Sequence, residues 1–170
     1  MFPRPDAWHN QNAYVTTDMD QALALWRDAF DVTSFMVFEN DAPGMVCSRP
    51  YRLKIALANV GGTEIELIQP LDGNAFYSDV LPKDGSFAIS FHHICMRIDG
   101  PLANFDAHMA SLDPVVHPVV YSGGMADMMR FAYTDERATL GHFIEHVWFD
   151  DDFYAQMAAA SSKMDSGIKR

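Results

Sequence analysis

The chain has 170 residues, 49% of them hydrophobic, which is enough for the core of one ordinary domain or of two joined half-size ones. Its formal net charge of −11, with no basic stripe, opposes attraction to phosphate backbones and so excludes nucleic acid as a partner. No apolar run approaches the roughly 18 to 20 residues that span a bilayer, and the start lacks the apolar core of a secretion signal, so we expect a cytoplasmic protein without a membrane partner.

The first half of the chain alternates between strand and helix patterns. Two prolines in the first five positions predict an arm over residues 1–10. Apolar residues from Ala22 to Ala29 recur at spacings of three and four, which predicts an amphipathic helix from 17 to about 30. The glycine pair Gly61-Gly62 favours a hairpin. The strands expected here cover residues 11–16, 32–38, 52–59 and 63–69, with a loop over 39–50.

The second half repeats this order. A short turn of helix at 75–81 leads into a strand over 90–99, and Pro101 is placed for the first position of a helix over 101–111. Gly123-Gly124 predicts a loop, and a last helix over 151–160 precedes a polar tail at 161–170. The strands expected after the second helix cover residues 115–120, 130–133 and 142–148. Both halves therefore run strand, helix, three strands, an internal duplication of pattern rather than of identity.

The strand over 90–99 carries two histidines on opposite faces. Side chains alternate in an extended strand, so Phe91, His93, Cys95 and Arg97 share one face. The other face is mostly apolar and suits packing against the following helix. We expect His92 on that face, toward the helix or a subunit contact.

Two carboxylates occupy equivalent places at the ends of the two halves. Glu66 lies between Ile65 and Leu67, and Glu145 follows Ile144, so each carboxylate points away from the apolar side of its strand. Gln11 and His93 begin the two halves in the same way. If the halves pair by pseudo-symmetry, these polar residues converge in one cleft: Gln11, Glu66, His93 and Glu145.

Four motifs carry a resemblance to a known family: 11–18 (QNAYVTTD), 64–70 (EIELIQP), 91–99 (FHHICMRID) and 141–145 (GHFIE). Over roughly residues 8–149 the chain resembles the vicinal oxygen chelate superfamily of glyoxalases, bleomycin-resistance proteins and dioxygenases, nearest the glyoxalase I and methylmalonyl-CoA epimerase branches. The resemblance implies an α+β fold of two paired βαβββ modules, about 8–70 and 90–149, forming a curved mixed sheet around a central cleft. It further implies one domain over 1–170, with a C-terminal helix and tail at 150–170.

The resemblance also implies a metal site and a reaction. In those branches the matching positions bind a divalent ion, which makes Gln11, Glu66, His93 and Glu145 the expected ligands of Zn²⁺, Ni²⁺, Co²⁺ or Mn²⁺. The reaction is then proton transfer beside a carbonyl through an enediolate or enolate, on a small carbonyl compound or its thioester or thiol adduct. Glu145 is the first candidate for the base and Glu66 the second. The chain is expected to be a lyase, isomerase or epimerase that forms a homodimer.

Other interpretations of these residues stay open. A lone strand histidine is more often a satisfied core residue than a ligand, and an amide such as that of Gln11 is a poor ligand, so His9 on the same face is an alternative. A metal-free small-molecule binding protein of the resistance type is the second hypothesis, which metal analysis separates from the first. The third is an extradiol dioxygenase, which uses two histidines and a carboxylate for iron, and Gln11 at the first histidine position counts against it.

The substrate-binding residues are expected beside the glycine-rich loop and on the neighbouring strands. Met128 is a candidate for an adaptable wall over an apolar substrate, although methionine more often fills gaps in a core. Arg52 and Arg130 are candidates for holding a substrate carboxylate or phosphate, with a surface role as the alternative.

Overall fold

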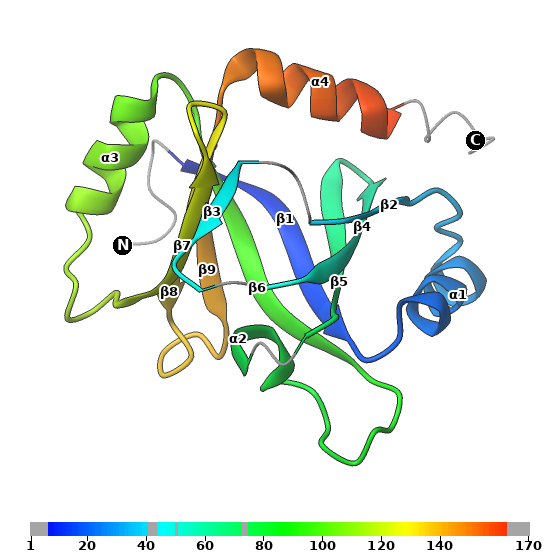
Figure 1. The fold of residues 1–170 in the computed structure, drawn as a ribbon. Coiled ribbons are helices and arrows are strands. Elements are labelled where there is room, and N and C mark those ends of the chain that lie inside the picture. The colour runs from blue at the N-terminus through cyan, green and yellow to red at the C-terminus, as the bar shows by residue number, and fades with distance from the viewer. Residues whose placement is uncertain (1–6, 41–43, 50, 73–74, 163–170) are drawn as a thin grey trace. The chain divides into compact units, whose positions relative to one another are not determined.

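The computed structural model describes residues 7–40, 44–49, 51–72 and 75–162 (Figure 1). They form two compact units, each of which we describe by itself. The His93 unit comprises Met1–Gln11, Pro43–Pro50 and His93–Ala155, and the Glu66 unit comprises Asn12–Ala42, Tyr51–His92 and Gln156–Arg170. The elements in chain order are β1 (Ala7–Thr16), α1 (Met19–Phe30), β2 (Met36–Glu39), β3 (Met45–Cys47), β4 (Leu53–Val60), β5 (Thr63–Pro70), α2 (Ala75–Ser78), β6 (Ile89–Ile98), α3 (Leu102–Ala110), β7 (Val119–Met125), β8 (Met129–Asp135), β9 (Phe143–Phe149) and α4 (Asp151–Ser162).

The Glu66 unit is built on the strand order β2-β4-β5-β1, with antiparallel pairing of β2 with β4 and of β4 with β5. Gly61 and Gly62 both have positive φ, +62° and +89°, as the tight turn between β4 and β5 requires. Helix α1 buries Met19 and Ala22 against apolar residues of these strands, among them Leu67. The alternation that buries Leu67 turns Glu66 toward the opposite face of β5.

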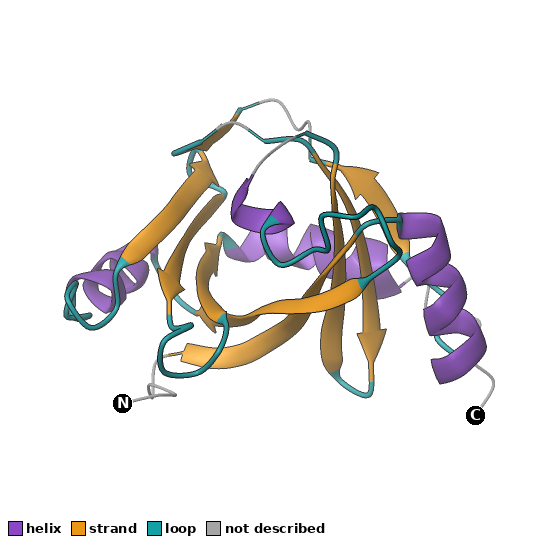
Figure 2. Cartoon of the chain, turned by 90° about the horizontal axis from the view of Figure 1, so that it is seen from below, coloured by secondary structure: helices purple, strands orange, loops and turns teal. Residues whose placement is uncertain are grey.

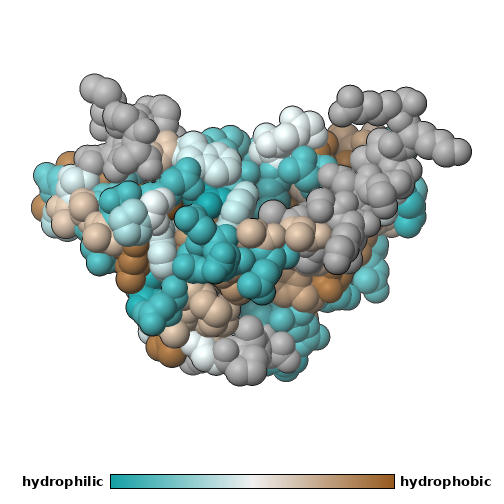
Figure 3. Space-filling view, turned by 90° about the horizontal axis from the view of Figure 1, so that it is seen from above, coloured by the Kyte–Doolittle hydropathy of each residue, from teal (hydrophilic) through white to brown (hydrophobic). Residues whose placement is uncertain are grey.

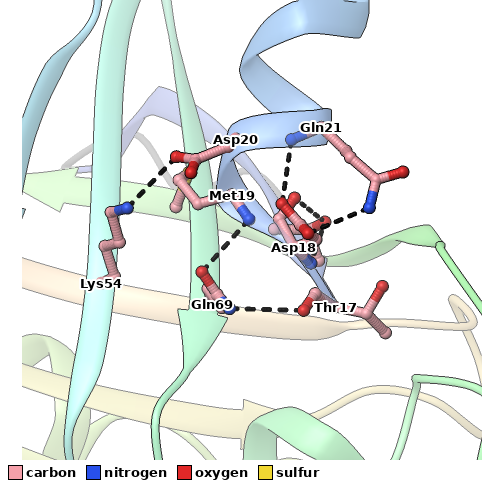
Figure 4. Close-up of polar contacts among 8 residues, drawn as sticks. Thr17, Asp18, Met19, Asp20, Gln21, Lys54 and Gln69 are labelled. Atoms are coloured by element: carbon pink, nitrogen blue, oxygen red, sulfur yellow. Dashed lines mark hydrogen bonds and ion pairs between the residues drawn. The ribbon is translucent and has the colours of Figure 1, made fainter. Parts of the chain in front are cut away.

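The start of α1 is held by side-chain capping (Figure 4). The carboxylate of Asp18 accepts hydrogen bonds from the backbone N–H of Gln21 at 2.9 Å and from its side-chain amide at 3.0 Å. These bonds lower the pKa of Asp18 below its ordinary value. Gln69 of β5 accepts from the Met19 N–H at 3.1 Å and donates to the Thr17 carbonyl at 3.3 Å, which ties the helix start to the strand.

The His93 unit is a mixed arrangement of strands in the order β6-β9-β8-β7-β3. Strand β6 pairs with β9 in parallel, and the other three pairs are antiparallel. Helix α3 packs on one face, where Phe105 meets Met96 and Ile98 of β6 and Trp148 of β9. Strands account for most of the regular structure (Figure 2).

The expected fold class is confirmed. The chain has an α+β fold. The second half contains the predicted order of strand, helix and three strands, and the first half contains this order with one further strand, β3. The apolar face of β6 packs on α3 as the alternation predicts. Buried His92 accordingly contacts a helix, but this helix is α2, where its Nε2 lies 3.1 Å from the Phe76 carbonyl and its ring stacks on Tyr77.

Several element predictions are wrong in their bounds. Strand β1 begins at Ala7, within the expected arm, and β2 begins only at Met36. Asp31 and Val32, which precede β2, form the C-terminal cap of α1 instead. Asp31 adopts a left-handed conformation, and the Val32 N–H donates to the Trp26 carbonyl. Pro101 is the N-cap of α3 rather than its first helical residue. Residues 1–6 of the arm and 163–170 of the tail lie outside the described residues.

Two predicted loops contain strand. Strand β3 lies inside the expected loop 39–50 and pairs with β7, whose bounds include Gly123 and Gly124. A Cβ at Gly123 would lie 2.8 Å from the Val46 carbonyl oxygen and 2.5 Å from the Phe131 ring. The missing side chain therefore permits close strand pairing here rather than a turn.

Among the described residues, the helices are too short or too polar to cross a membrane. The face shown in Figure 3 is dominated by hydrophilic residues with apolar ones between them. This surface accords with the net charge of −11.

Candidate active site

His93 and Glu145 lie together in the His93 unit. On the parallel strands β6 and β9, Cys95 is paired with Glu145 and His93 with Phe143. Since side chains alternate, His93, Cys95 and Glu145 share one face, opposite the face that packs on α3. The Nε2 atom of His93 lies 3.5 Å from Oε2 of Glu145, with the His93 side chain fully buried and that of Glu145 13% exposed.

Hydrogen-bond donors surround the Glu145 carboxylate. Tyr133 lies directly opposite Glu145 on β8. Its hydroxyl, the Cys95 thiol and the His93 ring, an ion-pair partner at 3.5 Å, are the groups that act on the carboxylate. Burial acts to raise the pKa of Glu145, but the hydrogen bond and charge of His93, followed by the Cys95 and Tyr133 hydrogen bonds, outweigh it and lower that pKa. The carboxylate is therefore held in its ionised form.

Aromatic rings fix the surroundings of this pair. The ring of Tyr133 meets that of His93 edge to face, with centroids 5.0 Å apart. The rings of Tyr121 and Phe131 also contact Tyr133, with centroids 5.8 and 5.9 Å from that of Tyr133. Such packing limits the rotation of both His93 and Tyr133, so the donor directions are set before any ligand arrives.

The other two predicted ligands are placed differently. Gln11 is buried, with 7% exposure, and belongs to the His93 unit on β1, the neighbour of β6. Glu66 lies opposite Leu57 in the Glu66 unit. Because each unit is described by itself, the convergence of Glu66 with the His93–Glu145 pair stays a prediction. His9, the alternative to Gln11, is exposed, and its Nε2 lies 3.2 Å from the Gln11 carbonyl oxygen.

The predicted substrate-binding residues have ordinary surface partners. Arg52 forms an exposed ion pair with Glu39 at 3.1 Å. Arg130 donates to the backbone carbonyls of Ala126 and Met129 in the turn between β7 and β8. Met128 is 39% exposed on the same turn. Their roles toward a substrate stay predictions.

The spacing of His93 and Glu145 fits two ligands of a divalent metal ion. Metal–nitrogen and metal–oxygen bonds of about 2.0 to 2.1 Å at a tetrahedral angle separate two ligand atoms by roughly 3.4 Å, close to the 3.5 Å between His93 and Glu145. Within the described residues, however, no group of three or more His, Cys, Asp or Glu is arranged to hold a metal ion. The pair could supply two ligands, and the completion of the set by Gln11 and Glu66 stays a prediction.

Sequence reasoning missed Cys95 and Tyr133 as partners of Glu145. The alternation did place Cys95 on the same face as His93, but no role was assigned to it. Tyr133 could not be paired with Glu145 from the sequence, because the register of β8 against β9 depends on the turn between them.

Comparison with known proteins agrees with this architecture. Residues 10–133 match the family model described as the Glyoxalase/Bleomycin resistance protein/Dioxygenase superfamily. The chain belongs to this superfamily. A search of curated proteins finds no match.

The solved structures that are similar to this chain include enzymes. A hypothetical protein from Bacillus halodurans C-125 is 16% identical, with 85% of this chain and 96% of that chain covered and a TM-score of 0.60. Methylmalonyl-CoA epimerase from Mycobacterium tuberculosis is 17% identical, with coverage of 86% and 91% and a TM-score of 0.58. A variant of the Streptomyces coelicolor epimerase in complex with 2-nitronate-propionyl-CoA is 17% identical, with coverage of 84% and 94% and a TM-score of 0.59. At these identities the likeness shows the shared fold.

Proposed function

We propose that this superfamily member is a metal-dependent isomerase or epimerase that moves a proton next to a carbonyl. The observation that carries the proposal is the His93–Glu145 contact of 3.5 Å, at which the carboxylate is kept ionised by surrounding donors. A carboxylate must be ionised to accept a proton from carbon and also to bind a divalent cation. The fold shared with methylmalonyl-CoA epimerases supports the same class of reaction.

The proposed substrate is a small carbonyl compound held as a thioester, because one neighbouring epimerase structure contains 2-nitronate-propionyl-CoA. Gln11, Glu66, His93 and Glu145 would hold a divalent ion such as Zn²⁺, Ni²⁺, Co²⁺ or Mn²⁺, which would supply Lewis-acid polarisation of the carbonyl oxygen. Arg52, Arg130 and Met128 are the proposed contacts to the rest of the substrate. Glyoxalase-type lyase chemistry uses the same proton transfer and belongs to the same proposal.

The base is either Glu145 or Glu66. A carboxylate whose pKa is lowered is a weaker base, since proton transfer is most efficient when the pKa lies near the working pH. A substrate that takes over the Tyr133 or His93 hydrogen bond would return the Glu145 pKa toward its ordinary value. Glu145 is therefore the base only if substrate binding loosens its donors, and otherwise Glu66 fills this role.

Exchange of the substrate α-proton in D₂O tests this proposal. The protein is loaded with each of the four metals in turn, and loss of the α-proton of methylmalonyl-CoA is followed by NMR. We expect exchange by the wild type and a loss of about 100-fold or more in Glu145→Gln or Glu66→Gln, whichever is the base. Asp106→Asn, an exposed carboxylate on α3, is the matched control.

Metal counted per chain in the same samples separates the two roles of each carboxylate. A variant that keeps its metal and loses exchange has lost the base, whereas one that loses both has lost a ligand. Absence of exchange with every metal overturns the proposal.

A metal-free binding protein of the resistance type is the second candidate. It is favoured by the finding that no group of three metal-binding side chains is arranged among the described residues. Failure of the wild type to retain any of the four metals on dialysis would support it. The homodimer and the cytoplasmic location also stay predictions, and light scattering tests the first.

A further inference from the structure

A small cavity lies on the α3 face of the His93 unit. Its volume is about 60 Å³. Its lining residues come from β1, β6, α3, β8, β9 and the connections around them: Ala7, Met96, His108, Leu112, His117, Thr134, Glu136, Leu140, Ile144 and His146. Ile144 and His146 alternate with Glu145 along β9, so this cavity opens on the face opposite the His93–Glu145 pair.

A chain of hydrogen bonds forms one wall of the cavity. The Nε2 atom of His108 lies 2.9 Å from Nδ1 of His146, whose Nε2 lies 3.1 Å from the Thr134 hydroxyl. Both imidazoles are buried, with 3% and 4% exposure. A single proton lies between the two rings, and the chain works in either direction because the hydroxyl both donates and accepts. This wall can therefore adjust its donors and acceptors to a guest.

A buried carboxylate, that of Glu136, also lines the cavity. The side chain of Glu136 is 5% exposed, and its Oε1 is 2.8 Å from Nδ1 of His117, which is 30% exposed. Within the part of the chain that the structure describes, the side-chain contacts of Glu136 are made through Oε1. Since an ionised carboxylate accepts on both oxygens, Oε2 can take a further donor.

The chemistry of the lining selects among possible guests. The Glu136 carboxylate and the net charge of −11 disfavour an anion. No group of three metal-binding side chains is arranged among the described residues, which disfavours a metal ion. The volume of about 60 Å³ admits a molecule of only a few heavy atoms, on the scale of a few buried waters. Apolar side chains such as Met96 and Leu112 suit the carbon part of such a molecule.

We propose that this cavity is a binding site for a small nitrogen base, either a short alkylammonium ion or an imidazole-like ring. Its N–H group donates to Glu136, its carbon atoms contact the apolar lining, and the Thr134 hydroxyl is the candidate for a further hydrogen bond. The site lies on a different face from the proposed reaction centre and does not depend on its activity.

Titration of the full-length protein with defined probes tests the site. Methylammonium and imidazole are added at fixed pH while NMR follows the methyl signals of Ala7 and Met96 and the ring signals of His117. We expect saturable shifts with at least one of these probes and none with acetate. Glu136→Gln should raise the Kd at least 10-fold, and Asp113→Asn, an exposed carboxylate, should leave it unchanged.

A cavity-filling variant keeps the test decisive if Glu136→Gln does not fold. Leu112→Phe adds volume to the lining and should abolish the shifts without removing any polar group. Absence of saturable shifts in the wild type overturns the proposal, as does unchanged binding in both Glu136→Gln and Leu112→Phe. Zn²⁺ that displaces the amines at lower concentration overturns it in favour of a metal site. Glu145→Gln should keep the binding, which separates this result from that of the exchange assay.

Discussion

Glu145 and His146 are neighbours on β9, yet they belong to two different polar clusters on opposite faces of the strand. Glu145 is a buried acceptor surrounded by the donors His93, Cys95 and Tyr133. His146 sits between His108 and Thr134, in bonds whose direction depends on the tautomer. The first cluster is organised by a charged carboxylate, and the second by two imidazoles and a hydroxyl, whose donor and acceptor roles can be exchanged.

This difference bears on what each cluster can do. Donors fixed around a charge stabilise the ionised state, which suits a metal ligand more than a base. A chain of imidazoles and a hydroxyl can exchange its donors and acceptors to match those of a ligand, which suits a binding site. Substitutions on the two faces should therefore differ in the size of their effect and in its dependence on pH.

The largest loss of stability is expected from His146→Ala. It removes two hydrogen bonds and enlarges a cavity, so the free energy of unfolding should fall by about 3 kcal/mol. Urea unfolding measures it. His9→Ala, on an exposed side chain, is the control and should change stability by less than about 0.5 kcal/mol. Equal losses in the two variants would show that the His146 cluster contributes little.

Tyr133→Phe should cause the next largest loss of stability. It removes a hydrogen bond to a buried carboxylate, which is worth about 2 kcal/mol at neutral pH, while the ring contact with His93 is kept. Because one donor is lost, the pKa of Glu145 should rise. Urea unfolding gives the first quantity, and the ¹³C shift of the Glu145 carboxyl against pH gives the second. An unchanged pKa would exclude the Tyr133 hydroxyl as a partner.

The pH dependence of stability should identify the charged cluster. The folded-state pKa of Glu145 lies below its ordinary value of 4.5, so its contribution is complete above that pH and is lost as the pH falls through the folded-state pKa. Glu145→Gln should remove this part of the slope, which is at most about 1.4 kcal/mol per pH unit for one proton. Unfolding curves of both proteins from neutral to acid pH measure it. Parallel curves would contradict the assigned direction.

The two faces also differ in how far the sequence predicted them. Alternation placed His93 and Glu145 each on the polar face of its own strand, because it depends only on neighbouring residues, and the pseudo-symmetry of the halves supplied the pairing of the two strands. The cavity residues His108, His117, Thr134 and Glu136 come from separate segments that no local pattern connects. A histidine on the buried face of α3 was the one available signal.

The errors in the predicted fold have the same cause, because contacts between distant segments cannot be seen in a local pattern. Gly123 was assigned to a loop because paired glycines usually mark turns, but its role is to allow Val46 and Phe131 to approach. Strand β3 could not be expected within a segment containing proline and glycine, since its only described strand partner is β7, far along the chain. In both cases a tertiary contact decides the local structure.

Thr134→Val should have the smallest effect and gives the sharpest comparison with Tyr133→Phe, because the two residues are adjacent on β8 and serve opposite faces. It removes a hydroxyl from a neutral hydrogen bond at 3.1 Å and keeps the shape of the side chain, so the loss should be about 1 kcal/mol. No carboxylate takes part, so the loss should not follow the protonation of Glu145, whereas that of Tyr133→Phe should decline as the pH falls through the Glu145 pKa. Urea unfolding of both variants at neutral pH and below pH 4.5, the ordinary value for Glu145, makes the comparison. If the two losses change together with pH, the clusters are coupled through β9 and are not the independent sites proposed here.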